Sequence, residues 1–499
     1  MNSKRFVALA LVLLMFTLAG CNSKPTEDSK GDATPIIFTF GVTTDPDHLD
    51  PFQATSADSR AMLFNLFEGL LKPSSSGKII PAVADNYEVS DDFTSYSFTL
   101  REVKFHNGEQ VTAEDVKYSI EQAIEYEMTG MSAISSVEIV DSKTVKISLK
   151  EPDSEFYYSM TTAIVPKDYE NQNSKPIGTG PFKFVSYTPQ QELVLAKHEG
   201  YWNSEYPKVD QLIFKIKADI NTILLELKAG SLDAGTVNTM SASQLDSKDF
   251  NIIYENTNAV QMLCLNNAVE PLNNALVRQA ISYAVSADEI IELVHDGHAQ
   301  RAGSPVIPAL VNGYNSDLNS AYAKNIDHAK ELLAEAGYPN GFSITITVPS
   351  VYQQHIDTAQ IIVNQLAEIN IKAEIKQVDW PTWLSETYTN RQYEATVISV
   401  DGITLSPRSY LFRYESKSSS NFVNYSSPDY DALFLKSLET NDETERTEIY
   451  HEMQTILSED AACVFICDIS APRVFRNGIS GFEPYPLYIF DGSTIYFDK

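Results

Sequence analysis

The residues that most often carry out chemistry are scattered along this chain without a recognisable catalytic arrangement. The sequence contains no GxSxG nucleophile elbow, no HExxH zinc motif, no P-loop and no GxGxxG fingerprint. His295 and His298 could supply two metal ligands, but no third ligand stands near them, and a solvated helix end is the simpler interpretation. The pattern favours a binding protein over an enzyme, and we expect neither a metal site nor a cofactor.

Three acids follow the first expected strand, in the stretch TTDPDHLDP. Asp45, Asp47 and Asp50 suggest calcium at first sight, but the spacing lacks the glycine and the later glutamate of an EF-hand loop. Asp and Asn side chains commonly bond to the main chain in turns. We therefore expect these acids to serve turn and capping roles.

Charge and cysteine content narrow the class of protein. The chain has 37 Lys and Arg against 67 Asp and Glu, a formal net charge of -30. Such a surface repels nucleic acid, so we expect no nucleic-acid partner. In the segment CVFIC, Cys463 and Cys467 are separated by about 13 Å of strand, too far for a disulfide. We expect these two cysteines and Cys264 to be buried thiols.

The N-terminus has the pattern of an export signal. Lys4 and Arg5 precede a short apolar run, and Leu18-Ala19-Gly20-Cys21 ends it with small residues and a cysteine. This resembles a bacterial lipoprotein signal over residues 1–20, with Cys21 as the lipidated residue; the alternative is an ordinary secretory peptide. Residues 21–35 are polar and aperiodic, as expected of a flexible tether. We expect an extracytoplasmic body that contacts the membrane through its lipid anchor alone.

The first half of the chain mixes strands and helices. Residues 36–42 predict a strand, and apolar residues at helical spacing predict a helix that reaches from 62 to 71. Residues 93–108 predict a strand pair that turns at Asn107-Gly108. Thr112 with Asp115 three positions later is typical of a capping box at a helix start.

The second half reads as a regular α/β unit. Residues 342–348 alternate as a strand, 358–370 form an amphipathic helix, and 371–378 form another strand. A strand, a helix and a strand with short links predict a parallel sheet. A helix that begins at Ser286, a helix that stops at Gly337 and a strand over 393–400 complete this part.

Several segments in one order resemble a known family. They are LDP (49–51), FEGLL (67–71), PAVA (81–84), SYSFTLREVKFHNGEQVTAEDVKYSI (95–120), PIGTGPFKF (176–184), YW (201–202), KAGSLDAG (228–235), LNNALVRQAISYAVSADEII (272–291), AKELLAEAGYPNGF (329–342) and VDWPTW (378–383). Together they resemble the family 5 extracellular solute-binding proteins, the oligopeptide and dipeptide receptors of ABC importers. The resemblance covers nearly the whole mature chain.

The resemblance implies an α/β, two-lobed periplasmic-binding-protein-like fold (type II, cluster C-like). Lobe I would contain residues 36–266, with an extra subdomain at about 52–185; lobe II would contain 267–472, and 473–499 would return to lobe I. The hinge strands would cross near 265–266 and 469–472. The implied function is capture of a peptide between the lobes by a monomer, for an ABC permease, either on the outer membrane face of a Gram-positive cell or membrane-anchored in a periplasm. The alternatives are a non-peptide solute (a metal chelate, a sugar or a signal), an extracellular hydrolase, and an adhesin or chaperone.

The same resemblance places the ligand near ISVDGITLSPRSYL. Peptide-binding relatives carry a Trp and flanking acids there, one of which holds the peptide amine; here Val400, Ser406 and Arg408 stand at those positions. Asp401 is the nearest remaining carboxylate and either takes over the amine contact or starts an ordinary loop. Arg408 either binds a ligand carboxylate or is a surface arginine.

Other expected ligand contacts come from both lobes. Trp380, Trp383 and Tyr410 either wall the pocket or belong to the core. Thr44 and Asp45 lie in the loop after the first strand, where relatives contact the ligand.

Overall fold

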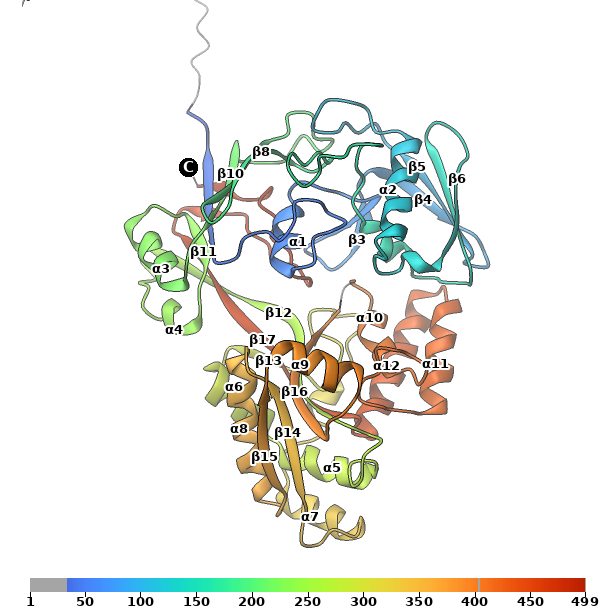
Figure 1. Ribbon diagram of the computed structural model, residues 1–499, viewed down its shortest axis with the longest axis vertical. Coiled ribbons are helices and arrows are strands. Elements are labelled where there is room, and N and C mark those ends of the chain that lie inside the picture. The colour runs from blue at the N-terminus through green and yellow to red at the C-terminus, as the bar shows by residue number, and fades with distance from the viewer. Residues whose placement is uncertain (1–33, 403, 499) are drawn as a thin grey trace, which may run out of the picture. The chain divides into compact units, whose positions relative to one another are not determined.

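The computed structural model describes residues 34–402 and 404–498 of the chain (Figure 1). The expected signal peptide, Cys21 and most of the expected tether lie outside the described residues. From Ile36 onward the chain forms one compact unit. No helix in the described part is both long and apolar enough to cross a membrane.

One eleven-stranded sheet runs through both lobes. Its main path has the order β15-β14-β16-β12-β17-β11-β1-β10-β9-β8, and β13 pairs with β17. The bounds are β1 Ile37–Val42, β8 Phe182–Thr188, β9 Glu192–Lys197, β10 Gln211–Ile216, β11 Ala234–Thr236, β12 Phe250–Leu265, β13 Ala299–Arg301, β14 Ser343–Pro349, β15 Lys372–Val378, β16 Ala395–Asp401 and β17 Cys463–Arg476. We call the part with β1 and β8–β11 lobe I and the part with β13–β16 lobe II (Figure 1).

Lobe I carries three smaller sheets and four α-helices. The sheets pair β2 with β3, β18 with β19, and β4-β5-β7-β6 in that order. Their bounds are β2 Leu71–Pro73, β3 Ile79–Pro81, β4 Ala84–Val89, β5 Ser95–Leu100, β6 Ile134–Ile139, β7 Thr144–Leu149, β18 Ile479–Ser480 and β19 Tyr496–Phe497. The helices are α1 Ala57–Leu63, α2 Ala113–Glu125, α3 Ile220–Ala229 and α4 Thr239–Ala242, with 3₁₀ turns at Met131–Ala133 and Phe156–Thr161.

Lobe II consists of helices around the sheet. They are α5 Ala275–Ala284, α6 Ala287–His295, α7 Ile326–Glu335, α8 Gln353–Ala367, α9 Trp380–Thr382, α10 Arg408–Leu411, α11 Pro428–Glu439 and α12 Glu443–Glu459, with 3₁₀ turns at Ser316–Ser320 and Phe412–Tyr414 and a π-helical turn at Trp383–Thr389. Strands β14 and β15 pair in parallel along their whole length, and β14 also pairs in parallel with β16. The predicted parallel βαβ unit is therefore confirmed.

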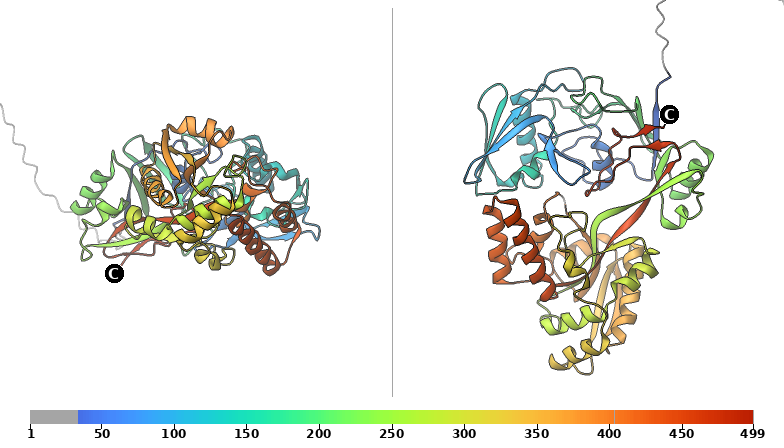
Figure 2. Two further views of the ribbon diagram at one scale, coloured as in Figure 1. Left: turned by 90° about the horizontal axis from the view of Figure 1, so that it is seen from below. Right: turned by 180° about the vertical axis from the view of Figure 1, so that it is seen from behind.

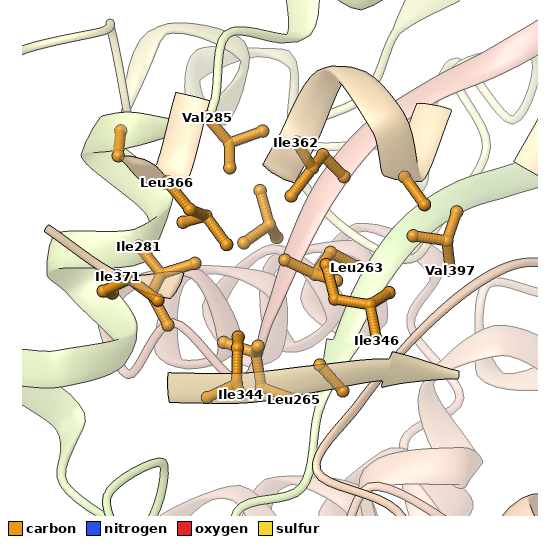
Figure 3. Packing of buried hydrophobic residues seen from close by; sticks show 14 of the residues in the cluster. Leu263, Leu265, Ile281, Val285, Ile344, Ile346, Ile362, Leu366, Ile371 and Val397 are labelled. Atoms are coloured by element: carbon orange, nitrogen blue, oxygen red, sulfur yellow. The ribbon is translucent and has the colours of Figure 1, made fainter. Parts of the chain in front are cut away.

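Apolar packing fixes α8 against this sheet. Figure 3 shows Leu263, Ile346 and Val397 of the strands beside Ile362 and Leu366 of α8. All five side chains are fully buried, and burial of each stabilises the lobe by about 1.5–3 kcal/mol. The lobe II strands of the main sheet are thus packed tightly against α8.

Two long strands, β12 and β17, connect the lobes (Figures 1 and 2). Residues 250–256 of β12 pair with 470–476 of β17 in lobe I, and residues 260–264 pair with 463–468 in lobe II. The register breaks between Asn256 and Val260, and Asn258 there has a positive φ of 58°. The crossing on β17 falls within the segment expected from the sequence, whereas the break on β12 lies upstream of Leu265, which pairs with Ala395 inside lobe II.

The predicted helix from 62 to 71 is wrong in its extent. Helix α1 ends at Leu63, and Leu71 begins β2. The main-chain oxygens of Asn65, Leu66 and Glu68 accept bonds from residues 182, 180 and 164 instead of from the next helical turn. The apolar residues stay buried, so the sequence pattern predicted burial correctly and assigned it to the wrong local structure.

The expectation of a solvated helix end at His295 is also wrong. His295 is 7% exposed, and its Nε2 donates to Oε1 of Gln261 at 3.2 Å. His298 stacks on Tyr254 with ring centroids 3.6 Å apart. These side chains help to attach α6 and its following turn to strand β12.

Candidate functional site

The carboxyl ends of the parallel strands in the two lobes face the crossing between them. In lobe I, β1 and β11 run in parallel, and β11 pairs antiparallel with β17. In lobe II, β14, β15 and β16 run in parallel, and β16 pairs antiparallel with β12 so that Asp401 lies opposite Ala259 near the register break. Ligands of open α/β sheets bind outside the carboxyl ends of the strands. The loops that follow these strands are therefore the candidate site.

A cavity of about 540 Å³, here called the interlobe cavity, lies at this place. Such a volume is in the usual range for ligand pockets. Both lobes and both crossing strands contribute to its walls, which are formed by Val237, Asn238, Thr239, Thr257, Ala259, Tyr352, Gln354, His355, Trp380, Ile398, Ser399, Ile469, Ser470, Ala471 and Pro472. A second cavity of about 610 Å³ lies wholly within lobe II, beside α8 and β15. We favour the interlobe cavity because a ligand in it would contact both lobes.

Aromatic side chains form one wall of the interlobe cavity. The Trp380 ring stacks on Trp383 with centroids 5.2 Å apart and planes 5° apart, and Tyr352 meets Trp380 edge-on at 5.5 Å. Trp383 is 3% exposed, and its Nε1 donates to Thr396 Oγ1 at 3.0 Å. Trp380 lines the cavity and Trp383 supports it from the core.

A buried polar network stands behind the same cavity. Nε2 of Gln261 donates to Nδ1 of His355 at 2.8 Å, and Oε1 of Gln261 accepts from His295 and Thr358. Burial, and then the neighbouring His295, lower the pKa of His355 to about 4. At neutral pH the imidazole that lines the cavity is therefore uncharged.

The predicted residues Thr44, Asp45 and Asp401 all lie at carboxyl ends of strands. Thr44 is exposed, whereas Asp45 accepts hydrogen bonds from Tyr187 at 2.7 Å and from the main chain of Gln190 at 2.9 Å within lobe I. Asp401 is exposed, and within the described residues its carboxylate takes part in no ion pair. Directly opposite residues in a strand pair share a face, so Asp401 stands beside Ala259 at the edge of the cavity.

Arg408 and Tyr410 lie elsewhere, at the start of α10. Arg408 Nη2 bonds Asp153 Oδ1 at 2.7 Å, and its Nε lies 3.6 Å from Glu155. Tyr410 is 1% exposed, and its hydroxyl donates to the main-chain oxygen of Asn258 at 3.3 Å. Arg408 thus connects lobe II to lobe I, and Tyr410 packs in the core beside the crossing.

Turn and capping roles are confirmed for Asp47 and Asp50, whereas Asp45 bonds the distant Tyr187 and Gln190. Asp47 accepts hydrogen bonds from the main chain of Thr55 and Ser56, just before α1. Asp50 accepts from the main chain of Phe52 at 3.0 Å. These carboxylates are therefore engaged in holding the chain that leads into α1.

Several residues that line the interlobe cavity were not predicted from the sequence. Tyr352 and His355 follow the strand at 343–349, and Ser399 lies near the end of the strand at 395–401. The rule that ligands gather at carboxyl ends of parallel strands could have found the lobe II members. It could not have found Asn238, because β11 is three residues long and carries no sequence pattern.

The fold and the sequence match proteins of known class. Residues 78–422 match the model of the bacterial extracellular solute-binding proteins, family 5. Heme-binding protein A of Haemophilus influenzae is 29% identical over 77% of this chain and 78% of its own. Glutathione-binding protein GsiB of Salmonella typhi is 28% identical over 88% of this chain and 90% of its own.

A solved structure shares the arrangement. The periplasmic binding protein DppA from Helicobacter pylori, in complex with the peptide STSA, superposes with a TM-score of 0.76 at 25% identity and covers 93% of this chain and 99% of its own. The family model alone spans well over half of the chain. This chain belongs to the bacterial extracellular solute-binding proteins of family 5.

Proposed function

We propose that this chain captures a peptide in the interlobe cavity and delivers it unchanged to the permease of an ABC importer. The observation that carries the proposal is the cavity itself, which both lobes line at the facing carboxyl ends of their strands. Contacts to both lobes favour the closed arrangement, because a ligand stabilises the state with which it makes more contacts. The peptide-bound DppA and the glutathione-binding GsiB support a peptide as the ligand class, since glutathione is a tripeptide.

Asp401 is our candidate for the contact to the peptide's α-amino group. Its carboxylate is exposed at the cavity edge, and Arg413 donates to its main-chain oxygen at 3.4 Å and not to the carboxylate. A hydrogen bond to a charged group contributes about 1.5–3 kcal/mol, and solvent reduces this at an exposed position. We therefore expect Asp401→Asn to weaken peptide binding about tenfold.

The test is native mass spectrometry of the purified protein with a mixture of short peptides. Bound, intact peptides support the receptor, and steady formation of cleaved products would instead favour a hydrolase. Binding of heme, a metal chelate, a sugar or another non-peptide solute in place of every peptide would identify the alternative ligand class. Glu374→Gln removes one negative charge from an exposed position of β15 and is the matched control for Asp401→Asn. Equal affinity of the parent and the Asp401→Asn protein would reject the amine contact.

We further propose that the protein is a monomer without catalytic activity or a cofactor, held outside the cell membrane by a lipid on Cys21. The cysteine follows a short apolar run and small residues, as in lipoprotein signals. Replacing Cys21 by serine should release the protein from the membrane fraction without changing its affinity for peptide. Retention of the Cys21→Ser protein in that fraction would reject the anchor.

A further inference from the structure

The interlobe cavity is unusual in a chain of net charge -30, because no Asp, Glu, Lys or Arg is among the described residues that line it. His355, its one imidazole, is neutral at physiological pH for the reasons given above. A charged side chain in the interior of this cavity, away from Asp401 at its edge, would lose water without gaining a counter-charge from the lining residues, which is costly. The cavity therefore disfavours Lys, Arg, Asp and Glu side chains of a peptide.

The aromatic wall adds a positive preference. Trp380 is held in place by its stack on the buried Trp383 and by the edge contact with Tyr352. Aromatic rings gain about 0.5–1.5 kcal/mol from such stacked or edge-on contacts beyond their burial. Because Trp380 is already fixed, a ligand ring that packs on it loses little entropy from the protein side.

One buried hydroxyl of the wall has no partner among the described residues. Oγ of Ser399 is buried and makes no hydrogen bond with the described residues. Two other hydroxyls of the wall are engaged: Thr257 donates to Asp468 at 3.1 Å, and Ser470 donates to Asn256 at 2.7 Å. Buried polar atoms are normally paired, so the Ser399 hydroxyl is available to a neutral donor or acceptor of a ligand.

We infer that the interlobe cavity selects peptides by an uncharged aromatic side chain, which packs on Trp380 and Tyr352 beside the Ser399 hydroxyl. The inference rests on the proposed function, since it specifies which peptides the same cavity takes. Two parts of the site then bind different parts of the peptide. Asp401 at the cavity edge binds the peptide's amine, and the neutral interior binds a side chain.

Competition between tripeptides of equal length tests the inference. Each set keeps two alanines and varies the third residue among Phe, Trp, Leu, Lys and Asp, with the variable residue placed first, second or third. Native mass spectrometry of the purified protein with each equimolar set reports relative affinities. We expect Phe or Trp to exceed Lys and Asp by tenfold or more in at least one set. Binding of these peptides with no such preference overturns the inference and leaves the proposed function intact, whereas failure of every peptide to bind rejects both.

Substitutions in the cavity wall test where the preferred aromatic side chain binds. Ser399→Asp places a carboxylate in the cavity wall and should raise the affinity of the Lys peptide relative to the Phe peptide at least tenfold, while the neutral control Ser399→Asn should not. Trp380→Phe should keep the aromatic preference and Trp380→Ala should lose it. If Ser399→Asp and Trp380→Ala both keep the parent's order of affinities, the side chain binds elsewhere and the inference is wrong.

Discussion

Replacing Glu155 by glutamine should weaken the direct contact between the lobes. Glu155 belongs to lobe I and is 2% exposed. Its carboxylate accepts from the hydroxyls of Ser406 and Tyr450, the latter at 2.8 Å, and its Oε1 lies 3.0 Å from Nε of Arg446. Arg408 lies 3.6 Å away on the same side. One carboxylate of lobe I is thus surrounded by four side chains of lobe II.

The size of the effect follows from burial and from the groups that remain. Removing one partner of a buried ion pair costs about 3–5 kcal/mol. Glutamine keeps the shape and one acceptor oxygen, and Arg408 keeps its bond to Asp153 at 2.7 Å. We therefore expect a loss of about 2–3 kcal/mol in the free energy of lobe closure. This corresponds to a decrease of about 30- to 150-fold in the closing equilibrium.

Two measurements detect this change in the closing equilibrium. Because ligand affinity depends on the population of the binding-competent closed form, the Kd of a bound peptide should rise in the Glu155→Gln protein. Small-angle X-ray scattering of the ligand-free protein should give a larger radius of gyration than that of the parent. Glu151→Gln, at an exposed position four residues earlier, removes the same charge and should change neither quantity.

A lower free energy of unfolding in the Glu155→Gln protein, with both the Kd and the radius of gyration at the parent's values, would contradict this prediction. That result would mean that Glu155 stabilises the fold without affecting closure. A double-mutant cycle with Arg446→Met then measures how much of the loss belongs to this pair.

Two other predictions concern stability. Burial raises the pKa of Asp468 to about 7, well above its ordinary value of 3.8, although a hydrogen bond from Thr257 acts in the opposite direction. The folded state therefore binds the Asp468 proton more tightly than the unfolded state does. The stabilisation that this proton gives the folded state is complete below about pH 4 and is lost as the pH rises through about 7. Asp468→Asn should gain stability over the parent at pH 8 more than at pH 5 in guanidinium unfolding, and a larger gain at pH 5 would contradict this. Ile346→Ala, at a fully buried position of β14, should cost about 2–5 kcal/mol of unfolding free energy; a loss below 1 kcal/mol would show that the core collapses around the change.

Local patterns predicted the elements that local interactions determine. At the start of α2, Thr112 Oγ1 accepts from the main chain of Asp115 at 3.3 Å, and Asp115 accepts from the main chain of Thr112 at 2.9 Å, so the capping box is confirmed. The Ser286 side chain caps α6 by accepting from the main chain of Glu289 at 3.2 Å. The three body cysteines are buried free thiols, as their strand spacing and odd number predicted. For the two helix caps, the decisive contacts lie within three residues of one another.

The candidate site was less accessible to sequence reasoning, because long-range pairing creates it. The interlobe cavity joins Asn238 of lobe I to Tyr352 and Ser399 of lobe II through strands that cross between them. No residue spacing in the sequence predicts that these three side chains lie around one cavity. Trp380 was predicted as a pocket residue because it belongs to the aromatic segment VDWPTW. Trp383 belongs to the same segment but lies in the core.

Arg408 takes part in the contact between the lobes and is not among the described residues that line the interlobe cavity. From the resemblance to peptide-binding proteins, we expected this position to lie near the ligand's α-amino group, where an acid would be needed. An arginine cannot serve that role, and in this chain it bonds Asp153 and approaches Glu155 of the opposite lobe. This contact joins protein groups of the two lobes, whereas no Asp, Glu, Lys or Arg is among the described residues that line the interlobe cavity. Closure and selection then rest on different residues, so the Glu155→Gln protein should bind all peptides more weakly without changing their order of affinity.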